Sequence, residues 1–411
     1  MSITWLEIKK ALYSPTILIL LALFTIFNIF TVISNSYKKD ELKIVNVIIE
    51  KYGDTFNDEI LRKMQEDLNI DVKKLNPQFQ DVNTFINSMN YEKYHNTTLT
   101  EQKEIDRINL MQMYINLGIG LDERYAKLNI ELLKEETITE FGFTNWTADF
   151  VTSEYDKLND RLTEIKETNE YKNWFFAGNY QMHNELFRHL IKNIAMEGVI
   201  LVVLLTTLIT NYEFEHRTQL VTFATKKGRL LMLNKLMASL LATPIILLPL
   251  FGLSLLTFFT VYDFSGLWTA LITSGLNWEY KWPYITWWPI EYWEYLLLTI
   301  TILVITLLII SLLTFCISSI IKNSYLAWIA SILLLVSMFV VPMFFKGIPT
   351  LMLFMHLNLT LLLLNPHMYF SGVSNLMMFK YHEAWTLALC GLISAPCVTY
   401  AIRRFNRKDI V

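Results

Sequence analysis

The residues of this chain that could do chemistry are few, and they lie in apolar surroundings. Glu197 stands inside one apolar run, while His356 and Asn358 interrupt another. Ionisable groups inside a membrane are costly, and they commonly line a transport pathway or pair across a helix interface. We therefore predict a pathway or interface role for Glu197, His356 and Asn358. Glu197 is also close enough to the end of its run to reach the membrane surface instead.

Motifs for catalysis are missing from the sequence. It contains no G-x-x-x-x-G-K-[ST] loop to hold a nucleotide phosphate, no H-E-x-x-H and no G-x-S-x-G. His183 and His189 fall on different faces of a helix, so an ordinary polar surface is a better interpretation than a metal site. We predict no catalytic residue, no metal site and no cofactor bound by this chain. An intramembrane enzyme is therefore the least favoured class.

One extended polar run interrupts the apolar part of the chain, from Tyr212 to Lys235. It opens with two acids, continues through an amphipathic middle and closes with a basic cluster. An amphipathic helix here could bury Leu220, Val221 and Phe223 in the groove of a partner protein. Its basic end could also lie on anionic lipid headgroups, and a helix that rests on the membrane without a protein partner is the simpler alternative.

The composition explains why such a run stands out. The chain has 411 residues, of which 53% are hydrophobic and 14% aromatic, and the apolar residues are gathered into blocks. This pattern is typical of a membrane protein and not of a soluble enzyme. The net charge of −3 says little about partners, because the two signs are segregated along the chain. We expect no nucleic-acid partner. The three cysteines all lie in apolar segments, where they pack as small hydrophobic residues.

Six segments are long and apolar enough to cross a bilayer as helices. They are residues 15–34, 191–210, 236–261, 292–318, 324–345 and 384–402. Residues 1–14 read as an interfacial helix on the cytoplasmic side, and residues 403–411 as a cytoplasmic tail. We therefore predict an all-α polytopic membrane protein with six transmembrane helices.

The connections between these segments differ in character. Residues 35–190 have a soluble composition with helical periodicity, which predicts a mainly helical extracellular domain. Residues 211–235 hold the polar run. Residues 262–291 are rich in tryptophan, which indicates an aromatic belt with a short interfacial helix, or alternatively a site that stacks carbohydrate or lipid. Residues 349–368 are bounded by prolines and too short to cross, so we expect a re-entrant or interfacial segment.

Charge asymmetry predicts the orientation. If residues 349–368 do not cross, most cations of the short connections fall on one side, which the positive-inside rule makes cytoplasmic. These cations are Lys9, Lys10, Arg217, Lys226, Lys227, Arg229, Lys235, Lys322, Arg403, Arg404, Arg407 and Lys408. Only Lys281, Lys346 and Lys380 lie in the opposite short connections. The protein then spans the cell membrane with both termini in the cytoplasm, and residues 35–190 are extracellular.

The polar run resembles the first cytoplasmic loop of ABC-2 type transporter permeases, the membrane subunits of type V ABC exporters. The matching positions are Glu213, Glu215, Thr218, Leu220, Ala224, Thr225, Arg229 and Lys235, while Arg217 and Lys226 stand where that family has Gly and Pro. The order of an interfacial helix, a large outer domain, six spans and a re-entrant segment before the last span is similar too.

This resemblance implies a coupling helix within residues 213–227 that docks on a separate ATPase. The docking residues would be Glu213, Glu215, Thr218, Leu220, Val221, Phe223, Ala224, Thr225, Lys226, Lys227 and Arg229. The partners implied are two copies of an ABC ATPase, which binds ATP and Mg, a second copy of this chain or a paralogous permease, and membrane lipids. The substrate would be amphiphilic, namely a peptide, an antibiotic or a lipid-like molecule.

Two other functions fit the same segments. One is a non-transporting sensor or immunity protein whose outer domain binds a ligand such as an antimicrobial peptide. The other is a mechanotransmission permease, in which an ATPase drives the outer domain and nothing crosses. The second class usually has four spans, so the number of spans separates it from an exporter.

Overall fold

The computed structural model describes residues 2–407, except residues 179–180, 224–227, 280, 346, 375–376 and 378. Six helices in this part of the chain are long and apolar enough to cross a membrane. They are α2 (Pro15–Ser34), η3 with α11 (Asn184–Ile191 and Lys192–Glu215), α13 (Leu231–Val261), α14 (Tyr292–Ile320), α15 with η5 (Ser324–Val340 and Val341–Phe345) and α18 (His382–Arg407). The prediction of an all-α polytopic membrane protein is confirmed at this level.

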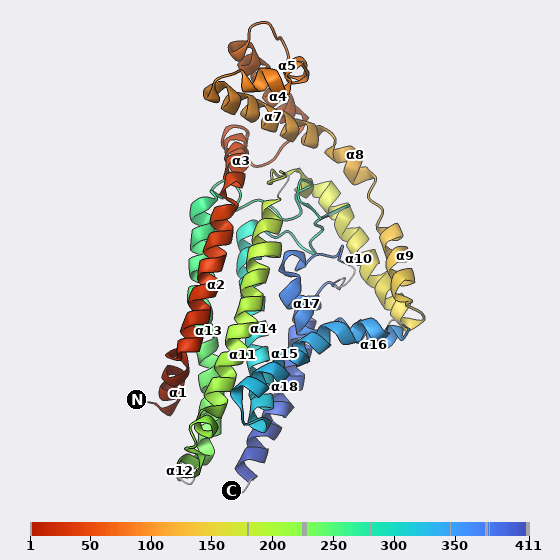
Figure 1. Cartoon of the computed structure of the whole chain (residues 1–411). Coiled ribbons are helices and arrows are strands. Elements are labelled where there is room, and N and C mark those ends of the chain that lie inside the picture. The colour runs from red at the N-terminus through yellow and green to blue at the C-terminus, as the bar shows by residue number, and fades with distance from the viewer. Residues whose placement is uncertain are drawn as a thin grey trace.

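The long helices form a bundle whose two ends are distinct (Figure 1). The N-terminal helix α1 (Ile3–Leu12), the C-terminus and the turn between α11 and α13 lie at one end, and a helical outer region lies at the other. The most apolar stretch of the η3–α11 helix is 78% buried, against 22% for α2 and 17% for the α15 helix. The α11 helix is therefore the axis of the bundle, and the others leave apolar faces exposed.

Small and hydroxyl side chains let the neighbours approach α11 closely. A Cβ atom on Gly198 would lie 3.0 Å from a methyl group of Leu307 in α14 and 3.1 Å from one of Leu247 in α13. Thr206 and Ser311 share a buried hydrogen bond of 2.9 Å between α11 and α14. Small residues and hydroxyl pairs of this kind hold helices together where water does not drive their packing.

The outer region is helical. It contains α3 (Lys39–Tyr52), α4 (Asp58–Leu75), α5 (Val82–Ser88), α6 (Tyr91–His95), α7 (Leu99–Ile119), α8 (Leu121–Ala126), α9 (Ile130–Phe141), α10 (Trp146–Thr168) and η2 (Glu170–Lys172). Gly53 has a φ of 92°, which an α-helix cannot continue through, so it separates α3 from α4. Thr98 and Glu101 form a capping box that starts α7.

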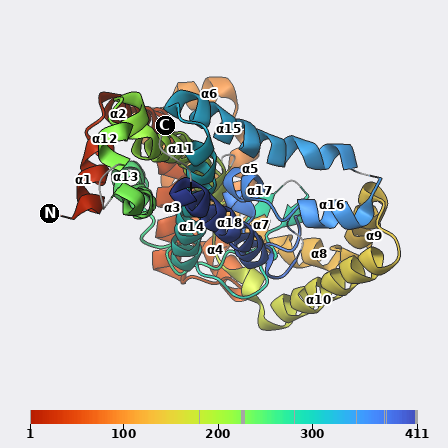
Figure 2. The same ribbon diagram turned by 90° about the horizontal axis from the view of Figure 1, so that it is seen from below.

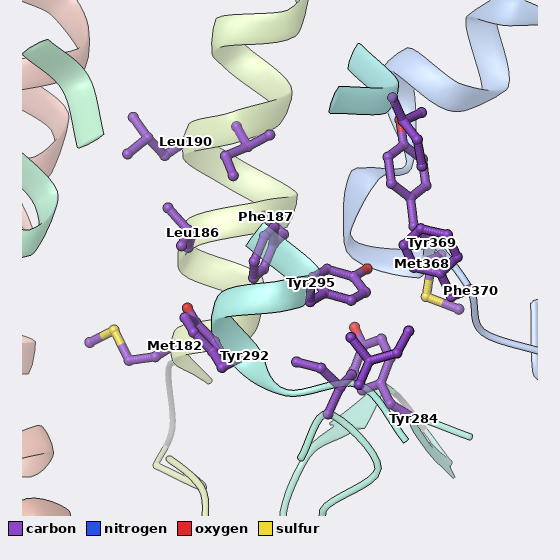
Figure 3. Close-up of a cluster of buried hydrophobic side chains, with 14 of the residues drawn as sticks. Met182, Leu186, Phe187, Leu190, Tyr284, Tyr292, Tyr295, Met368, Tyr369 and Phe370 are labelled. Atoms are coloured by element: carbon purple, nitrogen blue, oxygen red, sulfur yellow. The ribbon is translucent and has the colours of Figure 1, made fainter. Parts of the chain in front are cut away.

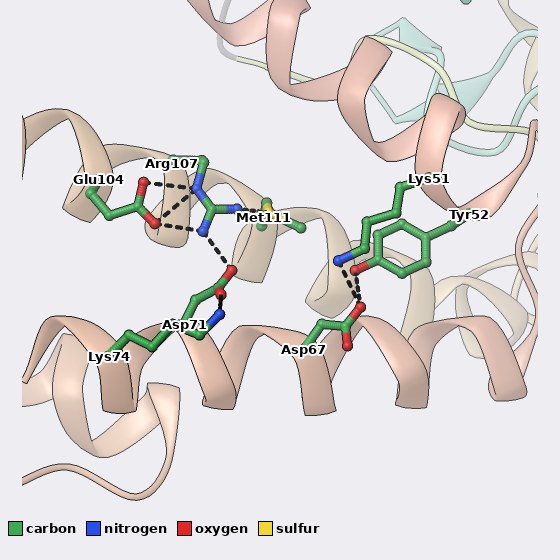
Figure 4. Close-up of polar contacts among 8 residues, drawn as sticks. All are labelled: Lys51, Tyr52, Asp67, Asp71, Lys74, Glu104, Arg107 and Met111. Carbon is green, nitrogen blue, oxygen red and sulfur yellow. Dashed lines mark hydrogen bonds and ion pairs between the residues drawn. The ribbon is translucent and has the colours of Figure 1, made fainter. Parts of the chain in front are cut away.

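Ion pairs join the helices at the far end of this region (Figure 4). Arg107 of α7 contacts Asp71 of α4 at 2.7 Å and Glu104 of its own helix at 2.6 Å. Asp67 of α4 accepts a hydrogen bond from the Tyr52 hydroxyl at 2.8 Å and pairs with Lys51 at 2.8 Å. These contacts fix α4 against both α3 and α7.

The tryptophan-rich connection forms a core between the outer region and the bundle. In the described residues 262–279 and 281–291 there is no helix, only turns and the two-residue strands β1 (Trp278–Glu279) and β2 (Trp282–Pro283), so the expectation of an interfacial helix is wrong. Tyr284 and Tyr292 are buried, and so is Trp287. Figure 3 shows these tyrosines and Tyr295 facing the start of the η3–α11 helix, where Phe187 lies edge-on to Tyr295. The rings are inside the protein because segments distant in sequence cover them.

Residues 349–368 fold into three short pieces, α16 (Pro349–Met355), α17 (Leu359–Leu364) and η6 (Pro366–Met368). None is long enough to cross a bilayer as a helix. Helix α17 packs among α11, α14 and α15. Seen along the bundle, α15 runs away from the axis, and α16 starts beside α9 and returns toward the axis (Figure 2). The tip of this hairpin lies beside the outer region, and this arrangement frames the cavity described below.

Candidate coupling surface and outer cavity

The polar run is not one helix in the described residues. Helix α11 continues to Glu215 and a turn follows; the described residues after it form α12 (Gln219–Phe223) and η4 (Gly228–Leu230). Arg217 has a φ of 55°, a left-handed conformation that an α-helix cannot continue through. Of the expected docking residues, Ala224, Thr225, Lys226 and Lys227 lie outside the described residues. Arg229 is described in its backbone only.

Helix α12 presents two apolar side chains and buries a third. Leu220 is 55% exposed and Val221 77%, whereas Phe223 is only 4% exposed. The Phe223 ring packs against Phe214 and Phe405, with centroid distances of 5.6 and 5.0 Å. Residues two apart on a helix do not share a face, so Val221 and Phe223 cannot serve the same contact. In this conformation Phe223 anchors α12, and Leu220 and Val221 remain available to a partner.

Beneath α12 lies a buried ion network that the sequence reasoning missed. Lys235 of α13 is fully buried and contacts Glu213 of α11, and its Nζ lies 3.5 Å from Glu7 of α1. Lys10 of α1 pairs with Glu7 at 2.7 Å and with Glu213 at 3.5 Å. Glu213 was expected on the docking surface, but it is 2% exposed and ties three helices together instead. The sequence contains one indication of this network. A lysine stands at the start of an apolar segment, and acidic residues stand in other segments that are predicted to lie at the same end of the bundle.

Glu215 and Thr218 have local roles. The carboxylate of Glu215 accepts a hydrogen bond of 3.0 Å from the backbone N–H of Ser324, at the first turn of α15. This placement satisfies a free amide and favours the positive end of the helix dipole. The N–H of Thr218 bonds the Glu213 carbonyl at 2.9 Å and shapes the turn. The last turn of α11, which precedes α12, is thus connected to α1, α13 and α15.

Glu197 is paired inside the bundle. The Asn28 side chain of α2 donates a hydrogen bond of 2.7 Å to the Glu197 carboxylate, and both residues are buried. Of the two sequence-based interpretations, this geometry matches an interface pair and not a side chain that reaches the surface. A buried carboxylate with such a partner holds α2 against α11.

His356 and Asn358 line a cavity of about 850 Å³ that Glu197 does not line. His356 packs edge-on to Phe141 of α9, with ring centroids 5.6 Å apart. The Asn358 side chain accepts a hydrogen bond of 3.1 Å from the N–H of Leu361 and so caps α17. The structure therefore brings two of the three expected pathway residues to one cavity and places the third elsewhere.

Neither the cavity nor the coupling surface resembles a metal centre. No group of three or more His, Cys, Asp or Glu side chains is arranged to hold a metal ion within the described residues. His183 contacts the His367 carbonyl at 3.0 Å, and Glu185 pairs with Lys38 at 2.7 Å.

Comparison of the chain with protein-family models, with curated proteins and with solved structures found no match.

Proposed function

We propose that this chain is the membrane-spanning, non-catalytic subunit of an ATP-driven exporter of the ABC-2 type. It works with two copies of a separate ATPase subunit, which binds ATP and Mg, and with a second copy of itself or a paralogous permease. The exported substrate is amphiphilic, and the site of action is the cell membrane.

The observation that carries this proposal is the exposed apolar pair of α12. Leu220 and Val221 lie on a five-residue helix at the tip of the bundle, beyond the apolar stretches of α11 and α13. Single exposed apolar residues are common on protein surfaces, but an adjacent pair on a helix held by a buried network offers a preformed contact. Docking of α12 in a groove of the ATPase would remove both side chains from water.

The orientation follows from charge. The N-terminus, α12 and the C-terminus lie at the same end of the bundle (Figure 1), and the sequence concentrates its cations there. The positive-inside rule assigns that end to the cytoplasm, where ATP is available. The outer helices α3–α10 then lie outside the cell, and residues 349–368 cover the outer end of the bundle as a re-entrant segment.

The contacts of the coupling surface define a route for force. When the ATPase subunits close on ATP, they would displace α12. Glu213 passes this displacement to α1 and α13 through Lys235, and Glu215 passes it to α15 through the Ser324 amide. Because α15 also carries the wall of the outer cavity, movement at the cytoplasmic end changes the shape of the cavity. This coupling links ATP hydrolysis to movement of the substrate.

Co-purification tests the proposal. The full-length chain should retain an ATP-hydrolysing subunit, and the double variant Leu220→Asp/Val221→Asp should lose it while still inserting in the membrane. Tyr13→Asp is the matched control, because Tyr13 is an exposed apolar residue of the same end of the bundle, 71% accessible and outside α12. A chain that never retains an ATPase, or a double variant that retains it as the control does, would sink the proposal.

Transport separates an exporter from a sensor. In vesicles that contain the complete complex, an amphiphilic substrate should stimulate ATP hydrolysis and accumulate on one side. Ligand binding to the outer helices without any such movement would favour the sensor function.

A further inference from the structure

The cavity of about 850 Å³ has three chemically different walls. Helix α9 supplies Glu136 and Glu140, and the start of the η3–α11 helix supplies Arg188 and Lys192. The third wall is apolar and comes from η5 and the residues just before it, with Phe339 and Met343 among its members. Its volume lies within the range of roughly 300–1,000 Å³ that is usual for small-molecule sites.

The two polar walls carry opposite charge. Arg188 is already paired with Glu279. No ion pair of Lys192 occurs among the described residues, and the same holds for Glu136. A ligand that meets both side chains needs an anionic group near the bundle and a cationic group near α9.

The apolar wall continues onto an exposed apolar surface. Val340, Met343 and Phe344 are 37%, 54% and 79% exposed, and they belong to one of the six helices that are apolar enough to cross a membrane. Water would be a poor solvent for so many adjacent apolar side chains. An amphiphile could therefore move from the bilayer into the cavity while its chains stay in apolar contact.

We propose that this cavity binds a zwitterionic phospholipid with an ammonium group, such as phosphatidylethanolamine. The phosphate contacts Lys192, the ammonium contacts Glu136, and the acyl chains lie along Phe339 and Met343. The inference deepens the proposed function by naming a ligand class, and it rests on that function only for the placement of the helices in a bilayer.

Lipid titration with detection by native mass spectrometry tests the site. The full-length chain in a non-ionic detergent is titrated with three lipids of identical acyl chains: phosphatidylethanolamine, phosphatidylglycerol, and a diacyl trimethylammonium lipid that lacks phosphate. Each of the last two lacks one ionic contact, so each should bind about tenfold more weakly than phosphatidylethanolamine.

Three single variants make the test specific. Lys192→Gln should weaken both phosphate-bearing lipids about tenfold. Glu136→Gln should weaken both ammonium-bearing lipids about tenfold, so that phosphatidylethanolamine falls to the level of phosphatidylglycerol, whose affinity stays unchanged. Glu135→Gln is the matched control, because Glu135 is the exposed neighbour of Glu136 on α9 and does not line the cavity. It should leave all three affinities unchanged.

The wild-type chain provides an independent check. Phosphatidylethanolamine with a photoreactive headgroup should label α9 or residues 188–192. Two results of the titration would overturn the proposal: equal binding of the three lipids, or an equal effect of Glu135→Gln and Glu136→Gln. Labelling confined to α2 and α13 would also overturn it, and so would displacement of the lipid by a cationic peptide. Because no ATPase is present, these results do not bear on the coupling surface, and loss of ATPase docking would leave lipid binding intact.

Discussion

Removal of the Lys235 ammonium should destabilise the end of the bundle at which α1, α11 and α13 meet. Lys235→Met keeps the unbranched aliphatic part of the side chain but leaves Glu213 and Glu7 buried with only Lys10 to neutralise them. Lys235 also donates hydrogen bonds to the carbonyls of Ile209 and Thr210, and these would be lost. The variant therefore tests whether the network holds the helices together or is incidental.

The expected magnitude follows from the burial. Breaking a buried ion pair by removing one partner costs about 3–5 kcal/mol, because the remaining charge is left uncompensated. Lys10 remains 2.7 Å from Glu7 and 3.5 Å from Glu213, so we expect the lower end of this range. The double variant Lys235→Met/Glu213→Gln removes both charges and should recover most of the loss, with a coupling energy of about 2 kcal/mol.

Thermal unfolding in detergent measures both effects. Lys235→Met should lower the Tm by on the order of 5 °C, and the double variant should regain more than half of that. If the single variant is as stable as the wild type, or if the effects of the two substitutions simply add, then the network does not connect α1, α11 and α13 as described.

Three further predictions concern the outer half of the molecule. Burial raises the pKa of Asp71, but hydrogen bonds from Arg107 outweigh this and hold the pKa below its ordinary value of 3.8. The stability that Asp71 contributes is thus present above about pH 4 and lost as the pH falls through the lowered pKa. Arg107→Met should lower the free energy of unfolding by about 1 kcal/mol at pH 7. It should also make the stability depend less on pH below about pH 4, as measured by thermal unfolding at a series of pH values. A steeper dependence would contradict the assignment. Burial lowers the pKa of His183 to about 4, so the unfolded chain binds the extra proton first, and stability should fall as the pH drops from about 6.5 towards 4. His183→Gln should reduce this slope in the same assay, and an unchanged slope would count against it. A Cβ atom at Gly372 would lie 2.3 Å from a methyl group of Leu158 in α10, whereas one at Gly391 meets nothing within 4 Å. Gly372→Ala should therefore lower the free energy of unfolding by about 1–3 kcal/mol, and Gly391→Ala should leave it unchanged. The opposite order would refute the close packing of α10 on the segment between η6 and α18 that contains Gly372.

The long apolar segments were predictable from sequence because their physics is local. Residues 15–34 coincide with α2 and residues 324–345 with α15 and η5, and the other four spans are found with ends that extend beyond the predicted ones. The extensions carry polar residues that only tertiary contacts can hold in a helix. Residues such as Glu213 and Lys235 fall in them, and the partner of each comes from another part of the chain.

The candidate site was less predictable because it depends on contacts between distant segments. Periodicity could not show that Phe223 packs on Phe405, or that the conformation of Arg217 would end the helix before α12. It also could not distinguish an aromatic belt from the buried cluster around Tyr292, since both need the same residue types. Composition identifies aromatic residues, but burial depends on what covers them.

Photo-crosslinking from position 221 shows whether α12 contacts an ATPase. A photoreactive amino acid in place of Val221 should capture, in native membranes, a protein that binds ATP, and the crosslink should be absent when the same amino acid replaces Tyr13. Crosslinks from position 221 to lipid alone, or to proteins that bind no nucleotide, would contradict the account.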